Sequence, residues 1–339
     1  MQNSLCILPR LEGIGGPASF QAKLIAGLAK YDIPVHYNPQ DIETNTMLVV
    51  GGTYHLLPIF RAKKRGVRVV QRLDGINWLH KKKSTGLYHY LRSEWYNLLL
   101  SRVRMLADHI VYQSNFTRDW WHTTYGHSNA THEVIYNGVD LQTFQPNTNN
   151  SLPHTPIRIL VVEGSFRGGH ERDLYNAVDF CNAFSSMFDR EVELIVAGRI
   201  PTKLREEVIF QGRANVLWKG LVAHEEINTL YWSAHLLFPA EINAACPNAT
   251  IEALACGLPI VSYATGSLPE LVGEDGGLVV PYGGNYWNLE APRVENLVKA
   301  AKQVLEDLPR YQKSARKRAE TIFSLDAMVK KYHAALFNN

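Results

Sequence analysis

Several signals that mark common classes of protein are missing from this sequence of 339 residues. Four cysteines are present, Cys6, Cys181, Cys246 and Cys256, and no two of them form a CxxC pair. This spacing argues against a disulfide framework and against a zinc site, and it fits a reducing compartment. No apolar run approaches the roughly 18 residues of a membrane-spanning helix, and no signal peptide is visible. We therefore expect a globular protein in the cytoplasm.

Signals for a metal ion and for a dinucleotide are missing too. The sequence has no His, Asp or Cys cluster with ligand spacing and no DxD motif at the end of an expected strand, so we predict no metal site. Gly13, Gly15 and Gly16 follow the first expected strand and open a helix, where glycine lets an anion approach the helix N-terminus. Their spacing is not GxGxxG, which disfavours a Rossmann dehydrogenase. A purely structural turn is the alternative for this loop.

Acidic residues are scarce in the first part of the chain. Residues 1–150 carry 16 Lys and Arg against 10 Asp and Glu, a net charge of +6, whereas residues 151–339 carry 19 against 22, a net charge of −3. Most of the basic excess lies in residues 61–118, together with aromatic side chains. Such a stretch suits membrane headgroups, nucleic acid or a phosphorylated acceptor, and a solvated protein face is the alternative.

Short β-branched runs alternate with helix-length segments, a pattern that predicts parallel α/β sheets. The runs are LCIL, TMLVV, VRVVQ, HIVYQ and EVIYN in the first half, and IRILVVE, VELIVAG, HLLFPA and PIVSY in the second. Residues 145–156, rich in Pro, Asn, Ser and Thr, predict a linker between two doubly wound domains. Ligands of such sheets bind at the carboxyl ends of the strands, so we expect both domains to face a cleft.

The stretch CPNATIEALACG, residues 246–257, predicts a helix over about 247–256, because Pro247 suits its first turn and Gly257 its end. The first turn presents backbone N–H groups to an anion. These groups belong to Asn248, Ala249 and Thr250. Glu252 lies one turn further on in a largely apolar helix, where its carboxylate can accept hydrogen bonds from two vicinal hydroxyls of a ribose. A solvated helix glutamate is the alternative.

Three segments resemble the retaining glycosyltransferases of family 4. NATIEALACGLPIVSYATGSLPELVGEDGGLVVP, residues 248–281, resembles their donor-binding region, and residues 107–146, with the run NGVD, resemble the late part of their first domain. AETIFSLDAMVKKYHAAL, residues 319–336, is similar to their C-terminal helices. The resemblance implies the GT-B fold, α/β with two Rossmann-like doubly wound domains. It implies an acceptor domain at 1–150, a donor domain at 151–322, and a C-terminal helix, 323–339, that crosses back to the N-terminal domain.

The resemblance also implies roles for individual residues. Glu252 falls on the second acidic residue of the family's Glu-x7-Glu motif, which holds the donor ribose. Asn248 and Ala249 fall where backbone amides meet the diphosphate, and Gly15 and Gly16 fall on the glycine loop beneath the donor.

Asp74 falls where many members carry a histidine near the transferred sugar. An acceptor-only carboxylate there suits hydroxyl donors. The family is generally thought to use a same-face route in which the leaving phosphate assists the acceptor, so Asp74 is a poor candidate for a nucleophile.

The chain departs from the family's pattern at two further places. The first acidic residue of the motif should stand at 244, where the chain has Ala244, and Glu241 lies three residues upstream, out of register. Members usually carry an Arg just after the first strand of the second domain and a Lys soon after. This chain has Ser165 in the Arg position and no Lys, so Arg167 and Arg172 are the nearest cations for the phosphates.

The resemblance implies a metal-independent, retaining glycosyltransferase without a resident cofactor. Its donor would be a UDP- or GDP-linked sugar, and its acceptor a glycan or a lipid-linked molecule, as in polysaccharide or lipopolysaccharide biosynthesis. Two alternatives stay open. One is a sugar-nucleotide-binding protein without transfer activity, and the other is a sugar-nucleotide 2-epimerase of related fold. Nucleic acid is not among the expected partners.

The basic stretch predicts a peripheral contact at the cytoplasmic face of a membrane. Lys81, Lys82 and Lys83 would dock on anionic headgroups. Nearby apolar residues fall at helical spacing on one stripe, for which a place in the core is the alternative. They are Leu87, Leu91, Trp95, Leu98 and Leu99.

Overall fold

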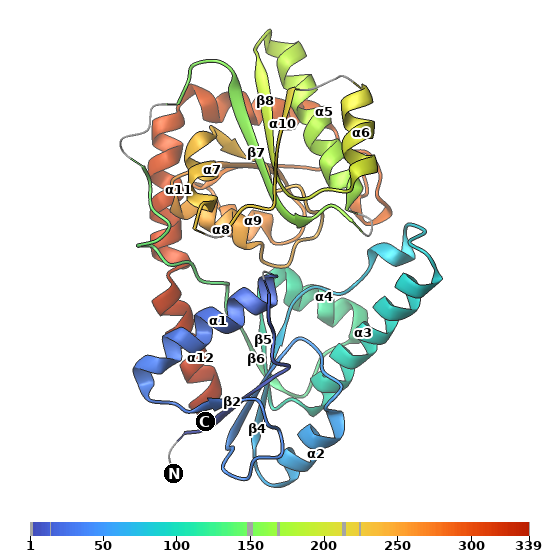
Figure 1. The fold of residues 1–339 in the computed structure, drawn as a ribbon, viewed down its shortest axis with the longest axis vertical. Coiled ribbons are helices and arrows are strands. Elements are labelled where there is room, and N and C mark those ends of the chain that lie inside the picture. The colour runs from blue at the N-terminus through green and yellow to red at the C-terminus, as the bar shows by residue number, and fades with distance from the viewer. Residues whose placement is uncertain are drawn as a thin grey trace. The chain divides into compact units, whose positions relative to one another are not determined.

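The computed structural model describes residues 3–13, 15–147, 152–167, 170–211, 215–223 and 225–338. The chain forms two compact units, Met1–Gly138 with Phe323–Asn339, and Val139–Ile322 (Figure 1). The first boundary between them lies earlier than the predicted position after residue 150, because the segment that follows Gly138 packs on the second unit. Residues 148–151 of the predicted linker lie outside the described ranges.

The first unit is built on a parallel six-stranded sheet in the order β2-β1-β3-β4-β5-β6. Its strands are β1 (Leu5–Leu8), β2 (Val35–His36), β3 (Thr46–Val50), β4 (Arg68–Leu73), β5 (His109–Tyr112) and β6 (Thr131–Val134). Every residue of β1, β3 and β5 is buried, as expected for parallel strands that are covered on both faces. The strand order reverses between β1 and β3, the point at which doubly wound sheets place their ligands.

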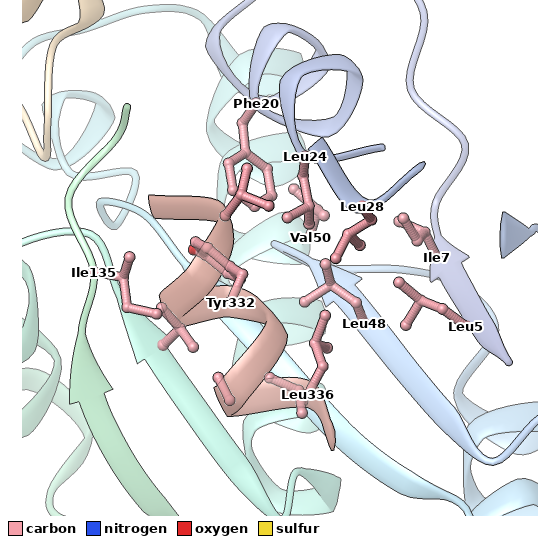
Figure 2. Close-up of a cluster of buried hydrophobic side chains, with 14 of the residues drawn as sticks. Leu5, Ile7, Phe20, Leu24, Leu28, Leu48, Val50, Ile135, Tyr332 and Leu336 are labelled. Carbon is pink, nitrogen blue, oxygen red and sulfur yellow. The ribbon is translucent and has the colours of Figure 1, made fainter. Parts of the chain in front are cut away.

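The predicted C-terminal helix belongs to the first unit. The α-helices of this unit are α1 (Gly16–Leu28), α2 (Leu56–Lys64), α3 (Leu87–Leu106), α4 (Asn115–Tyr125) and α12 (Leu325–Phe337). Figure 2 shows Tyr332 and Leu336 of α12 in one apolar cluster with Phe20 and Leu24 of α1 and with Leu48 of β3. The two ends of the chain therefore share a core, which explains why residues 323–339 return to this unit.

The NGVD run, residues 137–140, contains the end of the first unit's first segment, Gly138. The Asn137 Oδ1 atom accepts a hydrogen bond of 2.8 Å from Nη2 of the buried Arg72. A Cβ atom at Gly138 would lie 2.8 Å from the Cα atom of Leu325, so the start of α12 passes too close for a side chain at this position. The run therefore has a structural role, because Gly138 leaves room for the start of α12 to pack against it.

The second unit contains a parallel six-stranded sheet in the order β12-β11-β10-β7-β8-β9. Its strands are β7 (Ile157–Ser165), β8 (Val192–Arg199), β9 (Asn215–Gly220), β10 (Leu236–Leu237), β11 (Ile260–Tyr263) and β12 (Gly277–Val280). Its α-helices are α5 (Glu171–Phe188), α6 (Thr202–Gln211), α7 (Ile227–Ser233), α8 (Asn248–Ala255), α9 (Leu268–Val272), α10 (Val294–Glu306) and α11 (Leu308–Ile322). The strand order reverses between β7 and β10.

Helix α8 is held in place by α11 and by the segment that enters the second unit. Nη1 of Arg316, on α11, donates to the carbonyl oxygens of Ala255 and Phe144 at 2.8 and 2.7 Å. A cation at the last carbonyl of α8 also complements the helix dipole. Nδ2 of Asn228, on α7, donates to the Thr143 carbonyl at 2.7 Å. These bonds fix residues 143 and 144 to the second unit, which accounts for the position of the boundary.

Two further properties follow from the described residues. The four cysteines are buried free thiols. Within the described ranges, no helix is both long enough and apolar enough to cross a bilayer.

Candidate functional site

Helix α8 spans Asn248–Ala255, one residue inside the predicted range of 247–256 at each end. Pro247 is its N-cap residue, and Gly257 follows its end with φ +72°. The helix follows β10 at the carboxyl edge of the sheet, where the strand order reverses. Asn248 and Ala249 are half-buried, whereas Thr250 is fully buried, so the structure does not expose Thr250 to a ligand. The N-cap residue Pro247 donates no side-chain cap to the first turn of α8, an arrangement that favours an anionic ligand.

Glu252 is buried within α8, with 8% of its surface exposed. Tyr231 of α7 donates its hydroxyl to Oε2 of Glu252 at 3.1 Å. Burial, and then the Glu252 carboxylate, raise the pKa of Tyr231 well above its ordinary value, so this hydroxyl keeps its proton and stays a donor. A buried carboxylate is costly unless hydrogen bonds compensate it. The solvated glutamate that the sequence left open is therefore ruled out.

Two carboxylates meet where the strand order reverses. Glu163 lies near the end of β7, and its Oε1 atom accepts a hydrogen bond of 3.3 Å from the backbone N–H of Glu241, which follows β10. Burial, and then the carboxylates of Glu241 and Asp173, raise the pKa of Glu163 to about 8. The raised pKa favours the protonated form of the Glu163 carboxyl group, which can donate as well as accept a hydrogen bond.

A histidine–aspartate pair lies next to these carboxylates. Nδ1 of His170 and Oδ2 of Asp173 are 2.9 Å apart. Burial lowers the pKa of His170, but the bond to Asp173 and the charge of Glu241 outweigh burial and raise it to about 9. The imidazolium therefore balances part of the negative charge of the cluster. We define this cluster as Glu163, Asp173, Glu241 and His170.

The loop between Glu241 and α8 carries the missing acidic position. Ala244 is buried, and its carbonyl oxygen accepts a hydrogen bond of 3.0 Å from the backbone N–H of Ser267. Gly266, at φ +56°, approaches so closely that a Cβ atom there would lie 2.6 Å from the Ala244 carbonyl oxygen. Asn243, at φ +63°, is buried, and its side-chain amide has no hydrogen-bond partner among the described residues. A ligand hydroxyl at this amide would relieve that cost.

The two candidate cations for phosphate differ in their surroundings. Arg167 follows β7 and is exposed. Arg172, in the first turn of α5, is half-buried and forms a hydrogen bond with the Tyr282 hydroxyl. Arg167 is therefore the better placed of the two to move toward a diphosphate.

The predicted residues of the first unit also lie at the carboxyl edge of their sheet. Asp74 follows β4 and is half-buried. Burial raises its pKa, and the Arg72 guanidinium opposes that rise in part. Burial, and then the Asp74 carboxylate, raise the pKa of Tyr96 to about 12. Gly15 and Gly16 are exposed at the start of α1, which follows β1, and a side chain at either position would meet no neighbour within 4 Å.

The structure brings Asn248, Ala249, Thr250 and Glu252 together on one helix, as predicted. Sequence reasoning missed Tyr231 and the cluster around Glu163. In the stretch that contains Glu163, His170 and Asp173, it assigned a role to the arginines alone. The acidic residues and the histidine of this stretch were the signal that could have located the cluster.

Two family models match the chain. Residues 48–143 match the model described as Glycosyltransferase Family 4, and residues 166–314 match the model described as Glycosyl transferases group 1. The chain belongs to the glycosyltransferases of the family 4 type. The models span parts of both units and include Asp74 in the first unit and α8 in the second.

Comparisons with individual proteins agree with the family. A protein of Arabidopsis thaliana that is named as a subunit of phosphatidylinositol N-acetylglucosaminyltransferase is 26% identical over 183 residues, which are 52% of this chain and 37% of that protein. The match thus spans little more than a third of that relative. The sucrose-phosphate synthase of Thermosynechococcus elongatus has a TM-score of 0.72 at 16% identity, with 98% of each chain covered. Anabaena HepE, solved with UDP and glucose, has a TM-score of 0.70 at 15% identity, again over 98% of each chain. These likenesses confirm the predicted GT-B fold.

Proposed function

We propose that this glycosyltransferase moves a sugar from a nucleoside-diphosphate sugar to a glycan or lipid-linked acceptor, with retention of configuration and without a metal ion. The observation that carries the proposal is α8, which combines a first turn that its N-cap residue Pro247 leaves without a side-chain cap with a buried carboxylate at the edge of the sheet where ligands bind. The backbone N–H groups of the first turn would bind the diphosphate, and Glu252 would accept hydrogen bonds from the ribose.

The residues supply the means for the reaction. When the bond between the anomeric carbon and the phosphate oxygen breaks, the electron pair stays on the leaving diphosphate. The N–H groups of α8 and the exposed side chain of Arg167 would stabilise this charge. The acceptor hydroxyl would attack from the same face and pass its proton to the leaving phosphate oxygen. Asp74 would then hold a sugar hydroxyl rather than act as a nucleophile.

The nature of donor and acceptor is supported by what similar proteins are named for. HepE was solved with UDP and glucose, which favours a UDP-linked donor. The name of the Arabidopsis relative contains phosphatidylinositol, which favours a lipid acceptor.

A 2-epimerase is the second candidate, because one observation favours it. Such an enzyme needs carboxylates and histidines around the sugar, and Glu163, Asp173, Glu241 and His170 form such a set at the edge of the sheet. Loss of transfer is a third possibility, favoured by the buried Ala244 in place of an acidic residue.

Incubation of the protein with radiolabelled UDP- and GDP-linked sugars separates the three. Transfer to an acceptor, or slow hydrolysis without one, supports the proposal. A change of the sugar at carbon 2 means an epimerase, and binding without turnover means a binding protein. A Glu252→Gln variant is the control, because each of these activities should be weaker when the ribose contact is lost.

A further inference from the structure

Helix α3 carries apolar side chains on two opposite sides. On the inner side, Leu99, Leu100 and Val103 are buried in the core of the first unit. On the outer side, six large apolar or aromatic residues have exposed fractions between 40% and 81%. They are Leu87, Tyr88, Leu91, Trp95, Leu98 and Met105, which we name the outer stripe. Of the residues for which the sequence left a core position open, only Leu99 is in the core.

The outer stripe follows from the helical repeat. Leu87, Leu91, Trp95, Leu98 and Met105 are separated by three, four or seven residues, so they form one continuous band on the helix surface. An exposed apolar band of this length is unusual for a monomeric surface and marks an interaction site. Figure 1 shows α3 along the outside of the first unit, next to α2.

The charges around the outer stripe are mostly positive. Arg102 lies within the stripe and Arg92 at its edge, and both are exposed. Glu94 is the one acidic residue of α3, and its Oε1 atom is 2.7 Å from Nε2 of His80 and 3.0 Å from Nζ of Lys81. Lys81 is therefore paired with Glu94, and its role as a docking residue stays a prediction.

Lys82 and Lys83 continue the basic character toward the start of α3. Both are exposed. With Arg92 and Arg102, they surround the apolar band with positive charge.

We propose that the outer stripe of α3, with Lys82, Lys83, Arg92 and Arg102, docks this protein on an anionic lipid surface. Apolar and aromatic side chains on a helix that lies in the plane of the interface bury themselves at the boundary of headgroups and acyl chains, and tryptophan and tyrosine favour that depth. Basic side chains near the surface add attraction that salt screens. The inference adds a partner to the proposed function and does not depend on the transfer chemistry.

A second copy of the chain suits this face less well. A two-fold interface places the same surface patch on both copies. It would bring Arg92, Arg102 and the two lysines of one copy toward those of the other, while Glu94, the one acidic residue of α3, already pairs with His80 and Lys81. An anionic bilayer attracts all four basic side chains.

The test is sedimentation of the full-length protein with vesicles of phosphatidylglycerol and phosphatidylcholine, and with vesicles of phosphatidylcholine alone. Leu91→Ser/Trp95→Ser removes the centre of the outer stripe. Ile209→Ser/Phe210→Ser is the matched control, since it removes one aliphatic and one aromatic residue that are exposed on α6. Arg92→Gln/Arg102→Gln removes charge, and its matched control is Lys299→Gln/Lys317→Gln, at exposed positions of α10 and α11.

We expect the wild type to sediment with anionic vesicles at low salt and much less with phosphatidylcholine. The partition coefficient should fall at least about tenfold in Leu91→Ser/Trp95→Ser and roughly fivefold or more in Arg92→Gln/Arg102→Gln, while both controls match the wild type. Binding of a nucleotide sugar should be unchanged in all four variants. A failure of the proposed donor site would therefore be distinguished from a failure of membrane docking.

Three outcomes would overturn the inference. The first is a wild type that does not sediment with anionic vesicles, and the second is an equal loss of binding in the control variants. The third is a dimer in solution that Leu91→Ser/Trp95→Ser converts to a monomer, because the face would then be an interface between copies.

Discussion

Helix α8 of the second unit and helix α3 of the first both carry apolar residues at helical spacing, yet they place these side chains in opposite ways. In α8, the apolar residues are buried, and the carboxylate of Glu252 is buried with them. In α3, Leu91 and Trp95 are exposed. Each helix departs from the usual partition of side chains, in which charged groups lie outside and large apolar clusters inside. The buried charge points to a ligand, and the exposed apolar band points to a partner.

The largest expected difference between the two helices is in stability. Leu254→Ala, at a fully buried position of α8, should lower the free energy of unfolding by about 2–5 kcal/mol, because it leaves a cavity. Leu91→Ala, at an exposed position of α3, should change it by less than about 0.5 kcal/mol. Chemical denaturation of both variants measures the difference. Similar losses in the two would mean that Leu91 is packed in solution, and α3 would then not offer a free surface.

A second prediction extends the comparison to Glu163, a half-buried carboxyl group at the same edge of the sheet. The pKa of Glu163 is raised to about 8 in the folded protein, above that of the unfolded chain. The neutral form of Glu163 therefore contributes its full stability at pH values below the ordinary pKa of a glutamate. This stability is lost as the pH rises to about 8. Glu163→Gln stays neutral at every pH. The melting temperature of Glu163→Gln minus that of the wild type should therefore increase by at least about 2–4 °C from pH 5 to pH 8.5.

Glu295→Gln serves as the control for this pH series, because Glu295 is exposed on α10. Its melting temperature should follow that of the wild type throughout. The pKa of His170 is raised to about 9, so the stability that its charged form contributes is also lost as the pH rises. This loss occurs in all three proteins, because all three contain His170. A difference between Glu163→Gln and the wild type that does not change with pH would contradict the raised pKa.

The smallest expected effect is that of a chelator. If the first turn of α8 and Arg167 balance the negative charge of the diphosphate, turnover of the nucleotide sugar should be unchanged within error in EDTA. Activity that EDTA abolishes and manganese restores would show that the charge is balanced in another way.

Much of the fold could be predicted from the sequence, and the exceptions share a cause. β1 and β3 have the predicted bounds, and the central strands β4, β7 and β8 lie within a few residues of them. The strands that were missed, β2, β9 and β12, all lie at an edge of a sheet. Edge strands are covered less completely, so β9 alternates between exposed and half-buried residues instead of forming an apolar run.

The candidate site was predictable only where it is local in sequence. Capping residues and the family motif located α8 and Glu252. The contacts of Glu252 with Tyr231, and of Glu163 with Glu241, join residues on different elements, and only the folded sheet brings them together. The sequence also did not predict which side of α3 is exposed, because leucines at helical spacing fit a core and a docking face alike.

The most direct test of the account is a titration of UDP-glucose and GDP-mannose into the wild type and into Glu252→Gln, with calorimetry and thermal shift as readouts. The wild type should bind at least one of them. Glu252→Gln should bind it about 10- to 150-fold more weakly, because a charge-assisted hydrogen bond contributes about 1.5–3 kcal/mol, and its melting temperature without ligand should stay close to that of the wild type. Tyr231→Phe should show a smaller loss of the same kind. Equal affinity in a folded Glu252→Gln protein would contradict the donor site at α8.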